Sequence, residues 1–159
     1  MVLDFTRNKH ASTIDLEDGS ILVRTQVEDT FFAAAVEMTV KVPELEIASV
    51  KGEIKRAFND ECQKATSVLP KAVGLLIGPG IIKSVKGLIG GSGGCPRMAD
   101  LVLECCNEII LRFTFTSLRE MSAKSGQELL EAGREFIKQN PRMIGSCIAY
   151  AKGSPLLEI

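Results

Sequence analysis

The spacing of the apolar residues changes near residue 56, and this change limits the fold more than any other feature of the chain. Before it, three segments carry apolar residues on alternate positions, as half-buried strands do: 20–28, 32–42 and 45–56. After it, apolar residues recur three to four positions apart, which is typical of amphipathic helices. Strands followed by helices predict an α+β fold. We expect an N-terminal antiparallel sheet of three to four strands covered by C-terminal helices.

A tight turn joins the first two predicted strands. Residues 12–16 and 20–28 flank Glu17-Asp18-Gly19, and Asp-Gly supplies the positive φ that hairpin turns require. Pro43 ends the third strand, because proline cannot donate a hydrogen bond to a ladder. The strands are therefore expected over about residues 12–56.

Cap and turn residues divide the second part of the chain into helices. Asn59 or Asp60 can cap the first helix, and Pro96 suits the first position of a later one. Ser125 with Glu128 forms a capping-box signature. The predicted helices are 59–69, 71–77, 80–88, one from Pro96 past Arg112, one from Ser125 to Gln139, and a short one from Pro141 to near Gly153. They cover about residues 59–152, and the length favours one domain, 1–159.

Charge and composition exclude several classes of partner. A net charge of −1 and eight aromatic residues (seven Phe and one Tyr) argue against nucleic acid. The longest apolar stretch, 72–89, contains Pro79 and several glycines, so it is too interrupted to span a bilayer. The N-terminus is charged and does not resemble a secretory signal. We therefore expect a cytoplasmic location and no membrane partner.

Five cysteines without a secretory signal argue against a disulfide framework. There is no Cys-x-x-Cys, and His10 is the sole histidine, so the chain lacks the ligand spacing of a zinc finger. Cys105 lies on an apolar helical stripe and is predicted to be core, and Cys147 is also predicted to pack. Ten residues of helix separate Cys95 from Cys105 by about 15 Å, too far to share an ion.

A glycine-rich loop, 87–94, leads into Cys95 at the start of a predicted helix. Free N–H groups and the helix dipole at such a position favour the thiolate, which binds metals or attacks electrophiles. The alternative is a small residue that lets the helix start pack closely. The loop lacks the lysine of a nucleotide-binding P-loop. Cys62 lies in polar surroundings at a predicted strand-to-helix junction and is a second candidate.

The order of these elements resembles the U-type iron–sulfur cluster assembly scaffold proteins, which carry a cysteine after the third strand and another at the start of a late helix. The chain is also similar to a bacterial family catalogued as a domain of unknown function. The resemblance covers roughly residues 5–112. The matching elements are Arg7, Asp18-Gly19, Asp29, Cys62 and Gly94-Cys95.

The resemblance implies a metal site in which Cys62 and Cys95 are ligands and Asp18 or Asp29 assists. The cofactor it implies is an iron–sulfur cluster or zinc. The chain departs from the scaffold pattern at two places: Asp18 stands where the first cysteine would be, and Gly94 replaces the histidine before the last cysteine.

Two functions therefore stay open. One is a metal- or iron–sulfur-handling accessory protein that uses Cys95 and Cys62. The other is a non-catalytic binding or interaction module, a homodimer or a partner-binding protein, in which the cysteines are structural. A thiol enzyme is less favoured, because no sequence feature brings His10 to Cys95 as a general base.

Overall fold

The computed structural model describes residues 4–157, apart from the side chains of residues 116–118 and 142. Contacts divide the chain into two units, Met1–Leu111 and Arg112–Ile159. The expectation of a single domain over 1–159 stays a prediction.

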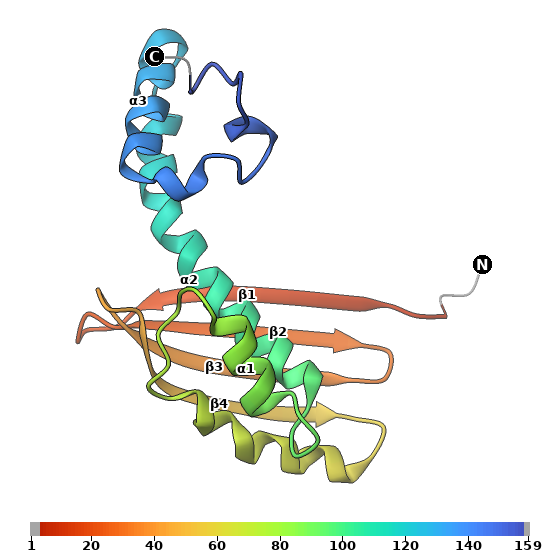
Figure 1. Cartoon of the computed structure of the whole chain (residues 1–159). Helices are drawn as coiled ribbons and strands as arrows, with labels where there is room; N and C mark the ends of the chain where they lie inside the picture. The colour runs from red at the N-terminus through yellow and green to blue at the C-terminus, as the bar shows by residue number, and fades with distance from the viewer. Residues whose placement is uncertain (1–3, 158–159) are drawn as a thin grey trace. The chain divides into compact units, whose positions relative to one another are not determined.

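The first unit contains a four-stranded antiparallel sheet, in which neighbours in the sequence are neighbours in space (Figure 1). The strands are β1 (Arg7–Asp15), β2 (Ile21–Asp29), β3 (Ala33–Lys41) and β4 (Glu46–Arg56). Gly19 has a φ of 82° in the first turn, as the Asp-Gly pair predicts. The predicted α+β fold, with an N-terminal antiparallel sheet followed by helices, is confirmed. Its likeness to the iron–sulfur scaffold proteins stays a prediction.

β1 begins at Arg7, five residues before the predicted start of the first strand. It is an edge strand, paired only with β2 in the described part of the chain. Only Ala11, Ser12 and Thr13 in the middle of β1 are half-buried. An edge strand buries too little surface to show the apolar alternation from which strands are predicted.

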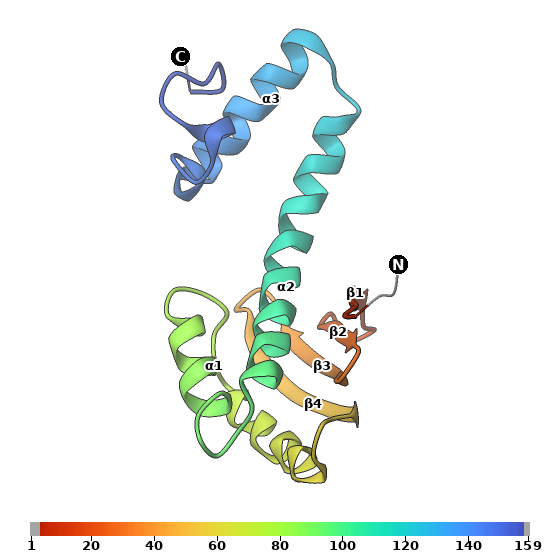
Figure 2. The same ribbon diagram turned by 90° about the vertical axis from the view of Figure 1, so that its right-hand side faces the viewer.

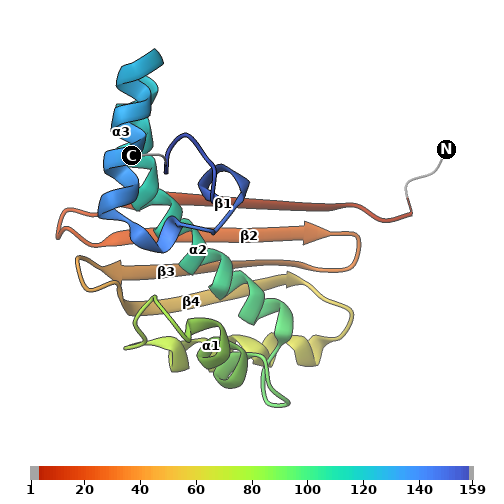
Figure 3. The same ribbon diagram turned by 45° about the horizontal axis from the view of Figure 1, so that its top comes forward.

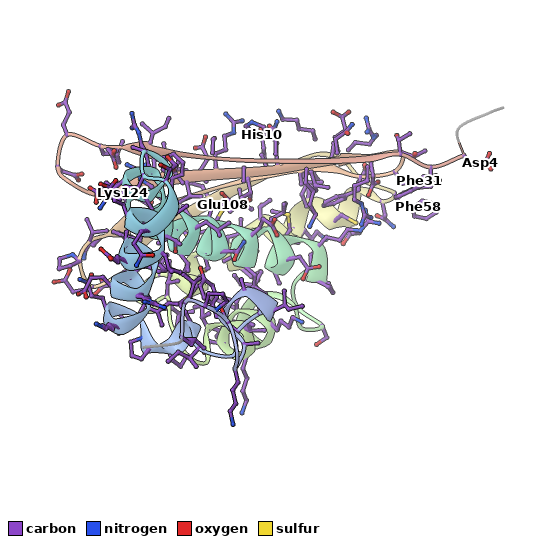
Figure 4. All side chains as sticks on the ribbon, turned by 90° about the horizontal axis from the view of Figure 1, so that it is seen from above. Asp4, His10, Phe31, Phe58, Glu108 and Lys124 are labelled. Carbon is purple, nitrogen blue, oxygen red and sulfur yellow. The ribbon has the colours of Figure 1, made fainter. Side chains whose placement is uncertain are left out.

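The two faces of the sheet differ in burial. In β2, the side chains of Val23, Thr25 and Val27 are buried, whereas Arg24 and Gln26 between them are exposed. The buried face carries the core, and the other face is open. Figure 4 shows His10 on the open face, away from the helices.

Helices cover the buried face within the first unit (Figures 2 and 3). They are η1 (Asp60–Ala72), α1 (Ile81–Ile89) and α2 (Pro96–Ser122), of which residues up to 111 belong to this unit. The Thr25 hydroxyl donates a hydrogen bond to the Leu101 carbonyl oxygen over 3.1 Å, which ties β2 to α2. The most buried large side chains of the core are Met38, Ile47, Leu69, Ile89, Met98 and Ile109.

Three helix predictions need correction. The helix predicted over 71–77 is wrong, because residues 73–77 run beside the start of β4, where the Ile47 N–H donates to the Leu75 carbonyl oxygen over 2.9 Å. The helix predicted over 59–69 is a 3-10 helix, η1, and it continues through Pro70 to Ala72. Its predicted cap is confirmed, because the Asn59 side chain accepts a hydrogen bond from the Glu61 N–H. Ser125 precedes α3 (Gly126–Gln139) but makes no capping hydrogen bond, so the predicted capping box is wrong. The backbone of Ser125 is extended, and Gly126 at the start of α3 has a φ of 56°.

The second unit consists of the end of α2, α3 and a C-terminal segment with two short helices, η2 (Pro141–Met143) and η3 (Ile148–Tyr150). The Arg134 guanidinium donates two hydrogen bonds to the Pro155 carbonyl oxygen, at 3.2 and 3.0 Å. An apolar cavity of about 380 Å³ lies between α3 and this segment, lined by Leu129, Leu130, Phe136, Tyr150 and Leu156 among others.

Candidate functional site

A buried carboxylate at the end of β2 organises one end of the sheet. Asp29 is 2% exposed. Its side chain accepts hydrogen bonds from the N–H groups of Phe31 (2.9 Å) and Phe32 (2.7 Å) in the β2–β3 turn. Aspartate commonly stabilises a turn in this way, because its short side chain reaches the N–H groups that follow it.

Three arginines from different elements meet at Asp29. Arg7 of β1 donates to the carboxylate from Nε (3.2 Å) and Nη2 (3.0 Å), and Arg97 in the first turn of α2 donates from Nη1 (3.4 Å). Arg56 at the end of β4 donates to the Asp29 carbonyl oxygen over 2.6 Å. One aspartate thus joins the first strand, the last strand and the long helix.

Opposing effects act on the pKa of Asp29. Burial raises it, but hydrogen bonds from the Phe31 N–H, Arg7 and the Phe32 N–H, together with the charge of Arg97, outweigh the burial. The pKa of Asp29 therefore lies below its ordinary value, and the carboxylate is ionised at neutral pH.

A small pocket of about 60 Å³ lies beside this carboxylate. Its charged lining consists of three cations, Arg7, Lys9 and Arg97, and two carboxylates, Asp29 and Asp100. This volume is far below the roughly 300–1,000 Å³ usual for small-molecule sites, so the pocket suits a small group such as a carboxylate rather than a metabolite. The excess of cations over carboxylates suits a negatively charged group.

Aromatic rings lie against two of the three arginines. The Arg97 guanidinium lies 4.8 Å from the centroid of the buried Phe32 ring, and that of Arg7 lies 5.3 Å from the Phe5 ring. Three other phenylalanines are exposed: Phe5 by 50%, Phe31 by 58% and Phe58 by 95%.

The register brings these exposed rings to one end of the sheet. The Thr6 and Thr30 backbones are hydrogen-bonded, which places Phe5 near the β2–β3 turn, and the pairing of Ala33 with Arg56 places Phe58 there too. Figure 4 shows Phe31 and Phe58 at the same end. We call this surface the sheet-end patch; it comprises Phe5, Phe31 and Phe58 with Arg7, Arg56 and Arg97.

The structure separates two of the predicted metal ligands. Asp18 lies in the β1–β2 turn, where its carboxylate accepts from the Ser20 N–H (3.0 Å) and hydroxyl (2.6 Å), and these bonds lower its pKa. Asp29 lies at the opposite end of β2, about 26 Å away at 3.3 Å per residue. Asp18 and Asp29 therefore cannot bind the same ion.

Cys62 in η1 and Cys95 before α2 are both half-buried and pack against the core of the first unit. Within the residues that the structure describes, no group of three or more His, Cys, Asp or Glu side chains is arranged to hold a metal ion. Metal or cluster binding by Cys62 and Cys95 stays a prediction.

The glycine loop before Cys95 has a packing role. The Cys95 N–H donates to the Ile89 carbonyl oxygen over 2.8 Å, which ties the residue before α2 to the end of α1. A Cβ on Gly94 would lie 1.9 Å from the same oxygen, which excludes any side chain there. The loop connects α1 closely to α2, and this need explains Gly94.

The remaining cysteines divide between core and surface. Burial raises the pKa of Cys105 to about 11 and that of Cys106 to about 12, and the predicted core position of Cys105 is confirmed. Cys147 is exposed, so its predicted packing role is wrong. It precedes the short η3 helix, where little of the chain lies over it.

Sequence reasoning missed most of this site. Arg56, Arg97 and the exposed rings of Phe31 and Phe58 were not expected to act together. One signal was available: two adjacent phenylalanines in a polar turn, Phe31-Phe32, of which one must be exposed if the next enters the core.

No helix in the described part of the chain has the length and apolar character needed to cross a membrane. No curated protein and no solved structure matches the chain. The family described as "Protein of unknown function (DUF2889)" matches residues 7–110, which include all four strands, Asp29 and its three arginines. The chain belongs to this family.

Proposed function

We propose that the protein is a non-catalytic interaction module, and that its sheet-end patch binds a partner segment with an acidic side chain flanked by apolar ones. The observation that carries the proposal is the combination of a cationic pocket of about 60 Å³ with three exposed phenylalanines at the same end of the sheet. The pocket would receive one carboxylate of the partner, and the rings would contact its apolar side chains.

The size of the pocket favours a docking site over an enzyme active site. Sites for small-molecule ligands usually measure 300–1,000 Å³ and enclose most of the ligand. A pocket of about 60 Å³ can accept only the end of a side chain. The rest of the ligand would then lie on the surface, as a peptide does.

The residue types of the patch are those that dominate protein interfaces. Arginine and aromatic residues are enriched at binding hot spots, because they combine apolar contact with directed hydrogen bonds. The arginines are held in place before binding: Arg7 by Asp29 and Arg97 by Asp29 and the Phe32 ring. Less side-chain freedom is then lost when a partner binds.

An array of short synthetic peptides, in which acidic and apolar content vary independently, tests the proposal. We expect binding only where both are present, and weaker binding as salt increases. Arg97→Gln is expected to weaken it by about tenfold or more, since a hydrogen bond to a charged group is lost. Phe58→Ala should weaken it by about fivefold or more.

Matched controls lie on α1. Lys83→Gln removes an exposed cation and Ile82→Ala an exposed apolar side chain, and neither residue belongs to the patch. Equal losses of peptide affinity in Arg97→Gln and Lys83→Gln would show that net charge alone attracts the peptides. Stoichiometric iron or zinc in the purified protein, abolished by Cys95→Ser, would instead favour the metal-handling function.

A further inference from the structure

The two edge strands of the sheet, β4 and β1, differ in what pairs with their outer side. Along the start of β4, the segment after η1 runs beside the strand: Gly74 N–H donates to Ile47 (2.8 Å), Ile47 N–H to Leu75 (2.9 Å), and Ile77 N–H to Leu45 (2.9 Å). β1, at the other edge, has a strand neighbour on one side only within the described residues.

The outward-pointing backbone groups of β1 follow from its pairing with β2. Leu16 donates to Ser20, and Thr30 donates to Thr6, so even-numbered residues of this strand face β2. In an antiparallel ladder, alternate residues direct their N–H and C=O groups to opposite sides. The groups that point outward are those of Arg7, Lys9, Ala11, Thr13 and Asp15.

β1 lacks most features that protect an edge from pairing. It is nine residues long, contains no proline and pairs with β2 in continuous register, without a bulge. Natural edge strands are usually kept short or interrupted by proline or bulges. The protection that β1 does carry is its charged side chains, Arg7, Lys9 and Asp15.

Those charges are distributed unevenly along the strand. Cations occupy its first part, Arg7 and Lys9, whereas Asp15 ends it and Glu17 follows in the turn. An antiparallel neighbour of the same sequence would bring the basic part of one strand beside the acidic end of the other. A parallel copy would instead place like charges side by side, which destabilises a sheet.

We propose that β1 pairs with β1 of a second copy of this chain, antiparallel and about a two-fold axis at Ala11, to form a continuous sheet across the dimer. This register places Arg7 opposite the partner's Asp15, and Lys9 opposite the partner's Thr13. All five outward-pointing residues then pair, which gives about ten main-chain hydrogen bonds. Any register shifted by two residues forms fewer.

The pairing does not depend on the proposed peptide binding. It uses backbone groups along β1, and Arg7 keeps its hydrogen bonds to Asp29. A two-fold arrangement of identical strands also closes on itself, so it ends at a dimer.

Sedimentation equilibrium of the full-length chain over a range of concentrations tests the inference. The wild type is expected to form dimers, and Ala11→Pro is expected to be monomeric. Proline removes an N–H that points away from β2, so the ladder within one chain is preserved. Ser12→Ala, on the same strand but with its N–H facing β2, is the control and should dimerise like the wild type.

A charge pair provides a second test that does not depend on proline. Thr13→Glu places a carboxylate opposite the partner's Lys9 at two symmetric positions and should lower the dimer Kd about fivefold. Thr13→Lys places two pairs of like charges at the same positions and should raise the dimer Kd about fivefold. A loss of folding alone would move both variants in the same direction.

Two results would overturn the inference. One is a wild-type chain that remains monomeric up to about 1 mM, an association of less than about 4 kcal/mol. The other is a dimer that persists unchanged in folded Ala11→Pro and shows the same Kd in Thr13→Glu and Thr13→Lys, because another surface must then hold it.

Discussion

Asp29 is a charged side chain that the fold buries and fully surrounds with donors. Two turn N–H groups and two guanidinium groups converge on its oxygens, and a third arginine binds its carbonyl oxygen. Buried charges persist where they are paired and hydrogen-bonded in this way. At the level of single residues, Asp29 is therefore the group on which the candidate site most depends.

The effect of Asp29→Asn is expected to depend on pH. An asparagine brings an NH₂ group among donors and removes the charge that pairs with Arg7, so the variant should be clearly less stable at pH 7. The folded pKa of Asp29 lies below its ordinary 3.8, so its stabilisation is complete above about pH 3.8 and is lost as the pH falls through the lower folded value. The stability difference should therefore narrow in acid.

Urea unfolding of the wild type and Asp29→Asn from neutral to acidic pH measures this effect. Asp100→Asn is the matched control, since Asp100 lines the same pocket but is exposed, and exposed charges contribute little. A stability difference between wild type and Asp29→Asn that stays constant over the whole pH range would contradict the assigned role of the carboxylate.

At the level of elements, β4, η1 and α2 meet at a glycine. A Cβ on Gly52 would lie 2.7 Å from Leu69 Cδ1, 2.9 Å from the Ala35 carbonyl oxygen and 3.0 Å from Met98 Cε. Leu69 and Met98 are fully buried, so their ends have little room to move. The helices approach the sheet closely because this position carries no side chain.

Gly52→Ala should therefore destabilise the protein by about 1–3 kcal/mol through overpacking. Gly87→Ala is the control: nothing lies within 4 Å of its Cβ position in α1, and alanine in an exposed helix should stabilise by up to about 1 kcal/mol. Urea unfolding of both variants gives the two values. Equal changes in the two variants would show that close packing at Gly52 is not the cause.

The elements also show what can be read from the sequence. Strand β2 and the second half of β3 are predictable because buried residues alternate there with more exposed ones. The start of β1 is not predictable, since an edge strand with polar residues on both faces carries no such pattern. The candidate site is harder to predict from the sequence than the strands are. Asp29 meets Arg7 and Arg97 across 22 and 68 residues, and only the strand register and the path of α2 bring them together.

At the scale of the whole molecule, the first unit contains nearly all of the core and the entire sheet-end patch. Its buried residues come from all four strands, η1, α1 and α2 up to Ile109, and the family match ends at residue 110. The second unit exposes several large apolar side chains, Phe113, Phe115, Leu129, Ile144 and Ile148. Most of the stabilising burial therefore lies before residue 112.

A chain that ends at Leu111 should fold without the second unit. We expect it to keep the strand content, unfold cooperatively, and bind the acidic–apolar peptides with the affinity of the full chain, because every residue of the patch is present. Circular dichroism, urea unfolding and peptide titration measure these three properties. A matched truncation after Met98 removes Val102, Cys105 and Ile109 from the core and should not fold. If the chain ending at Leu111 is also unfolded, the two units depend on each other for stability, and the expectation of a single domain over the full length would gain support.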